Sequence, residues 1–210
     1  MDDLTRQLEE FRSHLADERR ASPLTVSTYM RDLLALHTYC MDHELPLDAR
    51  KLRTGSLRAF LAASFDGRTA STMARKVSAV RAFFRFLEKR GHVTDNPAAS
   101  LTRPRVPKPL PEFVTVEDAF RVVAAPGKHA PDAVDEQRAE AIALRDAAIL
   151  ELLYSSGARV SEVAGLSLGS LDLAGHHARV LGKGQKERLV PLGAECIAAL
   201  QAYLPRRPDL

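Results

Sequence analysis

Apolar residues in the first part of the chain recur at intervals of three or four positions, which is the spacing of one face of an α-helix. The first series comprises Leu4, Leu8, Phe11 and Leu15. A second series follows Ser22-Pro23, because serine is a common helix cap and proline is common in the first turn. Its members are Val26, Tyr29, Leu33, Leu36 and Cys40. The two series predict two amphipathic helices.

Two further helices are predicted before the chain reaches residue 101. Thr54 is placed to cap the third helix. The apolar positions of this helix are Leu57, Phe60, Leu61 and Phe65. The fourth helix extends from about Thr69 to Arg90, where Gly91 is placed to end it. Its apolar positions are Val77, Val80, Phe84 and Leu87. Four helices with short connections predict an all-α helical bundle over residues 1–101.

Residues 102–111 interrupt this pattern with four prolines in ten positions. Proline lacks a backbone donor and restricts the residue before it, so neither a helix nor a central strand can cross this segment. The composition predicts an extended, semi-rigid linker that is also basic. We therefore expect a domain boundary here, with a second domain over residues 112–210.

The second domain combines helices with a small amount of strand. Thr115–Asp118 resembles a capping box at the start of a short helix, residues 126–136 have the composition of a surface loop, and a long helix is predicted from about Gln137 to Ser156. Residues 178–181 and 188–192 are prone to form strands, and the turn residues between them predict a β-hairpin. A final helix has apolar residues at Ile197, Leu200, Tyr203 and Leu204. The expected fold is mixed α/β, mainly α.

Composition narrows the class of protein. The 210 residues are 45% hydrophobic and 27% charged, which is typical of a folded chain. No apolar run reaches the ~20 residues of a membrane helix, and the start has no signal pattern, so we expect a cytoplasmic protein without a membrane partner. Cys40 and Cys196 are far apart and favour reduced thiols, although the sequence alone leaves a disulfide open. No cluster of His and Cys indicates a metal site.

Charge is distributed unevenly along the chain. Residues 1–110 contain 19 Lys and Arg against 13 Asp and Glu, whereas residues 111–210 contain 11 against 14. Within residues 51–90 there are 10 basic and 2 acidic residues, a local charge of +8. This asymmetry favours a polyanionic partner for the first half. A basic face that is merely solvated is the alternative.

The fourth helix concentrates part of this charge. Arg81, Arg85 and Lys89 are spaced by four residues and share one stripe of the helix. Such a stripe can follow a phosphate backbone or enter a major groove. The alternative is a solvated face in which Glu88 pairs with Arg85. The residues that we expect to contact DNA from this helix are Arg75, Lys76, Arg81 and Arg85.

Arg159 is a candidate phosphate-binding residue. It follows the helix-ending Gly157, and Ser161 is placed to start the next short helix. Arginine presents a rigid fork of donors that matches two phosphate oxygens. Glu162 is three residues away and close enough to hold that fork. An ordinary surface Arg–Glu pair, which contributes little, is the alternative.

The predicted hairpin adds a second candidate, Lys183, between Gly182 and Gly184. Flanking glycines permit a tight turn and a close approach of the backbone to a ligand. A lysine here can reach a DNA groove or donate a proton, although a solubilising turn lysine is the common alternative. Lys186 and Arg188 strengthen the case for phosphate contact, and they leave open which lysine matters.

Taken together, these segments resemble a known family. The matching segments are Ser22-Pro-Leu-Thr25, Tyr29-Met-Arg-Asp-Leu33, Arg75-Lys-Val-Ser-Ala-Val-Arg-Ala-Phe-Phe84, Asn96-Pro97, Leu110-Pro111, Leu144-Arg-Asp-Ala147, Leu153-Tyr-Ser-Ser-Gly-Ala-Arg-Val-Ser-Glu162 and Val180-Leu-Gly-Lys-Gly-Gln-Lys-Glu-Arg-Leu-Val-Pro-Leu-Gly193. The chain resembles the tyrosine recombinases of the integrase superfamily, and within it the bacterial Xer type. The last two segments are highly specific in combination.

This resemblance implies a helical, SAM-like core-binding domain and a catalytic domain that form a clamp around double-stranded DNA. It implies strand exchange at a specific site through a 3′-phosphotyrosyl intermediate, without metal, nucleotide or other cofactor. By motif position, Arg159 neutralises charge at phosphorus, Glu162 supports it, and Lys183 is the general acid. The implied partners are a related Xer recombinase in a heterotetramer and a DNA translocase that couples the resolution of chromosome or replicon dimers to cell division.

The chain also departs from the family pattern. Family members carry a His-x-x-Arg motif and a nucleophilic tyrosine downstream of the hairpin, and the 210 residues contain neither in that place. Tyr203, the one late tyrosine, occupies an apolar helix position and is expected in the core. We therefore expect an incomplete catalytic domain, truncated at its C-terminal end, that cannot cleave DNA. Two alternatives stay open, a DNA-binding protein without catalysis and a phage or transposon integrase, although the early start of the core-binding domain favours the Xer type.

Overall fold

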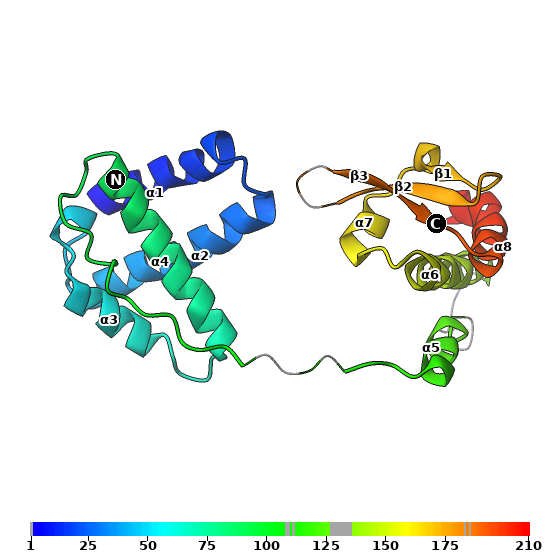
Figure 1. Ribbon diagram of the computed structural model, residues 1–210, viewed down its shortest axis with the longest axis horizontal. Helices are drawn as coiled ribbons and strands as arrows, with labels where there is room; N and C mark the ends of the chain where they lie inside the picture. Colours follow the sequence, from blue (N-terminus) through cyan, green and yellow to red (C-terminus); the bar gives the residue numbers. More distant parts are fainter. Residues whose placement is uncertain (1, 108–109, 111, 127–135, 183, 185) are drawn as a thin grey trace. The chain divides into compact units, whose positions relative to one another are not determined.

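The structure is a computed structural model that describes residues 2–107, 110, 112–126, 136–182, 184 and 186–210 (Figure 1). The chain forms two compact units, Met1–Leu110 and Pro111–Leu210. The division falls inside the proline-rich segment 102–111, whose described residues have no regular secondary structure. The expected loop at 126–136 lies almost wholly outside the described residues.

The first unit is helical, as predicted. Its elements are α1 (Asp3–Ser13), a π-helical turn η1 (His14–Glu18), α2 (Pro23–Asp42), a 3-10 turn η2 (Ala49–Lys51), α3 (Thr54–Ala63) and α4 (Ala70–Lys89). In Figure 1, α4 crosses α2, and these two helices pack against each other. The four predicted helices are therefore confirmed, with the π-helical turn as an unpredicted extension of the first.

Side-chain caps from the local sequence start α2 and α4. The backbone N–H of Thr25 donates to Ser22 Oγ at 3.2 Å, and that of Thr72 donates to Thr69 Oγ1 at 3.3 Å. The predicted cap at Thr54 is wrong, because Arg53 holds the N-cap position of α3. Thr54 is the first helical residue, and its hydroxyl donates to the carbonyl of Pro97 at 2.8 Å. This bond ties α3 to the chain that follows α4.

The core of the first unit forms where the apolar faces of the helices meet. The first series, Leu4, Leu8, Phe11 and Leu15, is buried as predicted. Phe83 and Phe84 of α4 are fully buried, and the ring of Phe83 meets that of Phe11 edge-on with 5.5 Å between centroids. Phe65 was expected on the apolar face of the third helix, but it lies beyond the end of α3 and is exposed. Burial of the rings of Phe11, Phe83 and Phe84 contributes strongly to the stability of the first unit.

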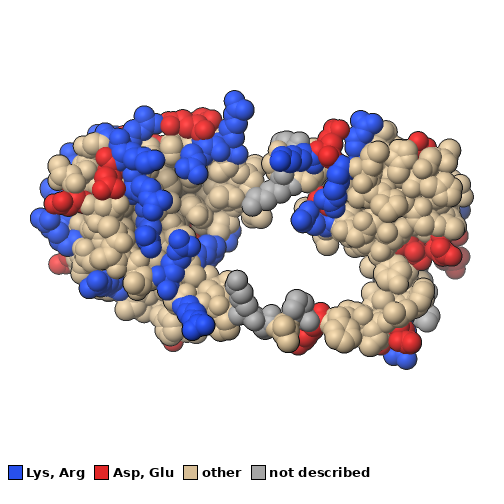
Figure 2. All heavy atoms as spheres, viewed as in Figure 1, with Lys and Arg blue, Asp and Glu red and all other residues tan. Residues whose placement is uncertain are grey.

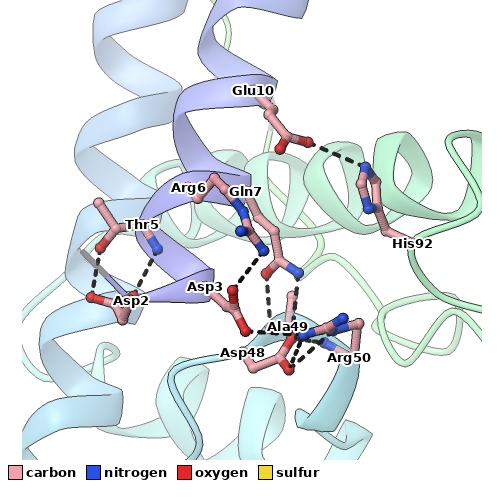
Figure 3. A network of polar contacts seen from close by, with 10 residues as sticks. All are labelled: Asp2, Asp3, Thr5, Arg6, Gln7, Glu10, Asp48, Ala49, Arg50 and His92. Atoms are coloured by element: carbon pink, nitrogen blue, oxygen red, sulfur yellow. Dashed lines mark hydrogen bonds and ion pairs between the residues drawn. The ribbon is translucent and has the colours of Figure 1, made fainter.

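A polar network fixes the start of α1 to η2 (Figure 3). Gln7 is buried, and its amide nitrogen donates to Asp48 Oδ1 at 3.3 Å while its amide oxygen accepts from the backbone N–H of Ala49 at 3.0 Å. Arg50 also binds the carboxylate of Asp48, and its side chain holds the pKa of that group below its usual range. These bonds satisfy buried polar groups that burial would otherwise penalise.

The second unit combines helices with a small sheet. Its elements are α5 (Val116–Val123), α6 (Glu136–Ser156), α7 (Val160–Ala164), η3 (Leu168–Ser170), β1 (Leu171–Asp172), β2 (His177–Leu181), β3 (Glu187–Pro191), α8 (Ala194–Tyr203) and η4 (Leu204–Asp209). The strands form an antiparallel sheet in the order β1-β2-β3, and Val180 of β2 lies opposite Arg188 of β3. The predicted hairpin and mixed fold class are confirmed, and β1 is an addition too short to be predicted.

The core of the second unit lies where the sheet meets α6 and α8, which pack together (Figure 1). Ala178 and Val180 alternate inward along β2, as half-buried strands require. Tyr203 packs against this core, as the sequence predicted.

Cys40 and Cys196 are both buried free thiols. Among the described residues, no helix is long and apolar enough to span a membrane.

The Gln7 network generates a stability prediction. Replacing Gln7 with Ala should destabilise the first unit by about 1–3 kcal/mol, because the N–H of Ala49 would be buried without a partner. Arg6→Ala is the matched control on the same helix, since Arg6 is exposed and should change stability by less than about 0.5 kcal/mol. Hydrogen exchange of residues 1–110, recorded at increasing urea concentration, measures the free energy of unfolding of both variants. Equal effects of the two substitutions would contradict the network's role.

Candidate active site

The turn between α6 and α7 positions Arg159. α6 ends at Ser156, and Gly157 follows with φ +58°, a left-handed conformation that favours glycine. Arg159 is the N-cap residue of α7, with extended backbone angles. Its backbone N–H donates to Glu162 Oε2 at 2.8 Å. The expectation that Ser161 starts this helix is wrong, because Ser161 is already its second residue.

Glu162 joins two arginines from different elements. Its side chain is buried, and Oε1 accepts from Arg159 Nη1 at 2.9 Å. Arg188 of β3 approaches the same carboxylate, donating from Nη1 to Oε1 at 2.8 Å and from Nη2 to Oε2 at 2.9 Å. Parallel bonds of this kind are the strong, directional form of an Arg–carboxylate pair. Glu162 therefore connects the start of α7 with the hairpin.

Gly182 lets the hairpin lie directly against this carboxylate. A Cβ atom on Gly182 would be 3.3 Å from Glu162 Oε1, which is a tight contact, and 3.6 Å from Arg188 Nη1, which is an ordinary one. The N–H of Gly182 donates to the carbonyl of Lys186 at 2.8 Å, which closes the end of the hairpin. We call Arg159, Glu162, Gly182 and Arg188 the Glu162 cluster. Close approach of another group to the backbone is a characteristic use of glycine.

The donors around Glu162 keep it ionised. The backbone N–H of Arg159, assisted by the side chains of Arg188 and Arg159 and opposed by burial, lowers the pKa of Glu162 from 4.5 to about 2. The carboxylate is therefore negative at any physiological pH. It holds both guanidinium groups with a fixed charge and a fixed direction.

The two arginines differ in what they leave free. The Arg159 side chain is 68% exposed, and only its Nη1 is bonded to Glu162, so Nε and Nη2 have no partner among the described residues. Arg188 is 40% exposed and commits both Nη atoms to Glu162. Arg159 thus retains donors for a phosphate. The expected DNA contact of Arg188 stays a prediction, and both of its Nη atoms already donate to Glu162.

Of the two candidate lysines of the hairpin, the structure describes Lys186. Lys183 lies outside the described residues. Lys186 is exposed and makes no ion pair in the described part of the chain. The described residues also contain no group of three or more His, Cys, Asp or Glu that could hold a metal ion. The choice between Lys183 and Lys186 is therefore a matter for experiment.

In the first unit, Arg75 and Lys76 are directed to Asp32 of α2. Lys76 is only 4% exposed, its Nζ lies 3.5 Å from Asp32 Oδ1, and it sits 5.0 Å from the centre of the Phe60 ring. Arg75 donates to the other oxygen of Asp32. Burial lowers the pKa of Lys76, although Asp32 opposes this effect. The expected DNA contact of Lys76 is corrected, because a buried ammonium cannot reach a phosphate.

The stripe on α4 is accessible. Arg85 and Lys89 are exposed, whereas Arg81 is partly buried and donates to the carbonyl of Leu101 at 3.2 Å. Glu88 accepts from the side chain of Asn96 at 3.0 Å and makes no described ion pair with Arg85. Figure 2 shows Lys and Arg atoms gathered along α4 on the face in view. This face has the charge that a phosphate backbone requires.

Comparison with known proteins identifies the family. The model of the phage integrase N-terminal SAM-like domain matches residues 8–91, and that of the phage integrase family matches residues 127–209. A tyrosine recombinase XerC from Myxococcus xanthus is 36% identical over 210 residues, covering 100% of this chain and 66% of the relative. The chain belongs to the phage integrase family of tyrosine recombinases. A XerC from Pelobacter propionicus is 38% identical over 211 residues, covering 99% of this chain and 66% of that relative.

Solved structures of tyrosine recombinases share the fold. A XerH recombinase bound to a palindromic difH substrate superposes with a TM-score of 0.68 at 20% identity, covering 96% of this chain and 57% of that one. A lambda integrase dimer bound to a COC′ core site gives 0.66 at 18% identity, covering 96% and 68%. The sequence resemblance and the fold class are confirmed. The chain spans about two thirds (66%) of the length of its XerC relatives.

Sequence reasoning missed the contacts of Arg188 and Gly182 with Glu162 in this member of the family. The motif spacing identified Glu162 as a partner of Arg159, and the structure bears this out. It gave no sign that Glu162 also binds Arg188, which is 26 residues away. Only the pairing of the strands brings these residues together. The glycine before Lys183 was a signal for close approach, but not for what it approaches.

The lowered pKa of Glu162 gives a pH prediction. A carboxylate whose pKa is lowered in the folded state stabilises the fold fully at a pH above its unfolded-state pKa. That contribution is lost as the pH falls through the folded-state pKa. The contribution of Glu162 should therefore fade from pH 4.5 down to about 2. Carbon-13 NMR of the Glu162 carboxyl should titrate with a midpoint near 2. A midpoint near 4.5 would mean that the carboxylate is not held by its arginines.

Proposed function

We propose that this protein acts in site-specific DNA recombination of the Xer type, with Arg159 as the residue that binds the scissile phosphate. The observation that carries this proposal is the state of Arg159. Its guanidinium is exposed, keeps Nε and Nη2 free among the described residues, and is held through Nη1 by a buried, ionised Glu162. A preorganised fork of this kind stabilises charge that develops on phosphate oxygens.

The proposed reaction is a reversible phosphoryl transfer. A tyrosine oxygen attacks the scissile phosphorus, forms a 3′-phosphotyrosyl bond, and displaces the 5′-oxygen of the next nucleotide. The nucleophile gives up its phenolic proton to water, and the departing oxygen gains one from Lys183 as general acid. Attack by the 5′-hydroxyl of another strand reverses the step. Arg159 neutralises the nonbridging oxygens in both directions.

We propose that none of the four tyrosines in these residues is the nucleophile. Tyr29 and Tyr39 belong to the first unit and pack against its core. Tyr203 packs against the second core and lines an apolar pocket of about 540 Å³. Tyr154 is exposed, but its ring meets Phe120 of α5 with 6.0 Å between centroids. The 210-residue chain is therefore expected to bind DNA without cleaving it.

The wider assignment rests on resemblance. We propose residues 1–101 as the core-binding domain, 102–111 as a linker, and 112–210 as part of the catalytic domain. The XerC relatives favour a Xer role over a phage integrase role, and chromosome partition is the role that we propose. In that role the partners are a recombination site, a second Xer recombinase in a heterotetramer, and a DNA translocase that links dimer resolution to cell division.

DNA affinity is expected to depend on the α4 stripe. Replacing Arg81 and Arg85 with Ala should weaken binding and flatten the slope of log K against log salt by roughly one unit per lost phosphate contact. Arg12→Ala is the control, because Arg12 is exposed on α1 and paired with Glu9. Fluorescence anisotropy of a labelled duplex at several salt concentrations measures both slopes. Parent-like binding by the double variant at every concentration would show that the stripe is only a solvated face.

The general acid can be identified with a sulfur substrate. In a hybrid that joins residues 1–210 to the part of the Myxococcus xanthus relative that they do not match, Lys183→Ala should slow cleavage by about 10²–10⁴-fold. A duplex whose leaving 5′-oxygen is replaced by sulfur should restore its rate, because sulfur departs without protonation. Lys186→Ala should weaken binding modestly and gain nothing from sulfur.

Two results decide this assignment. Rescue of Lys186→Ala instead of Lys183→Ala would show that the other lysine is the acid. The 210-residue chain alone should trap no covalent complex on a nicked duplex. A trapped adduct that Tyr203→Phe or Tyr154→Phe abolishes would place the nucleophile within these residues.

A further inference from the structure

The guanidinium of Arg188 is held by a carboxylate of the protein itself. Both of its Nη atoms donate to the two oxygens of Glu162, at 2.8 and 2.9 Å, in a bidentate pair. The carboxylate that it meets is 4% exposed and ionised. A guanidinium used in this way gives direction as well as charge, because its fork fits a carboxylate in one plane.

The pair connects two segments that carry the proposed chemistry. Glu162 belongs to α7, and its carboxylate accepts hydrogen bonds from the backbone N–H and the side chain of Arg159. Arg188 belongs to β3, which is the strand that follows Lys183 in the sequence. Gly182, at the other side of Lys183, lies close enough that a Cβ would meet Glu162 Oε1 at 3.3 Å. Both ends of the loop therefore border the same carboxylate.

We infer that Arg188 is a positioning residue, which fixes the β2–β3 hairpin to Arg159 through Glu162; Lys183 belongs to this hairpin by its position in the sequence. This inference rests on the proposed function of Arg159 and Lys183. The phosphate-binding arginine and the general acid must act on one phosphate, and an error of about 1 Å in such a placement lowers a rate by about 10²-fold. Arg188 is thus expected to affect cleavage more than DNA affinity.

Arg188→Met and Arg188→Lys separate position from charge. Methionine removes the guanidinium and keeps an unbranched chain, whereas lysine keeps the charge but offers a single point of contact. Both variants should accelerate hydrogen exchange at the Gly182 amide, which bonds the carbonyl of Lys186, by at least about tenfold. Exchange at the core residues of α6 should stay slow in both variants, which would show that the fold persists. Parent-like exchange in both variants would overturn the inference.

Binding of the 210-residue chain to duplex DNA distinguishes positioning from direct contact. The salt slope of Arg188→Met should equal that of the parent, since no phosphate contact is lost. A slope lowered by about one unit would identify Arg188 as a phosphate contact and overturn the inference. A parent chain that binds no DNA at any salt concentration would contradict the proposed function instead, and the exchange experiment would still decide the role of Arg188.

The sulfur substrate tests the link to the general acid. In the hybrid protein, Arg188→Met should slow cleavage of the ordinary duplex by about tenfold or more. The sulfur-containing duplex should recover most of that loss, because misplacement of the acid no longer matters. A slowed variant that sulfur does not rescue would mean that Arg188 does not act through Lys183. An unchanged rate would overturn the inference as well.

Discussion

A carboxylate withdrawn from water must be matched by donors, and Glu162 is the group where this constraint organises the site. Its two oxygens are satisfied by the backbone and side chain of Arg159 and by the fork of Arg188. Removing Arg188 would take away two of these four donors and leave the buried charge less well compensated. The turn after α6, the start of α7 and the hairpin are therefore held in one arrangement by a single side chain.

The first unit uses the same constraint for stability. Asp32 is buried on α2 and is matched by Arg75 and Lys76, both from α4. The charge of Lys76 also faces the ring of Phe60 on α3. Three helices therefore meet around one buried carboxylate. Basic residues of α4 thus divide into those that hold the bundle together and those, such as Arg85, that stay available to a polyanion.

The parts of the fold that were predictable depend on local sequence. The series that begins at Leu4 and the cap at Ser22 report the path of the chain within a few residues, and both are confirmed. The roles of Lys76 and Arg188 were not predictable in this way. Lys76 is buried because Asp32, far away in the sequence, packs beside it. Arg188 meets Glu162 because strand pairing sets its direction, which residue spacing does not encode.

We infer that Glu162 occupies Arg188 and leaves Arg159 available to a phosphate. Nitrogen-15 NMR of the arginine side chains, recorded with and without a duplex, tests this inference. The Arg159 Nε signal should shift on binding, while the Arg188 signals should keep their positions. A shift at Arg188 with no change at Arg159 would contradict it.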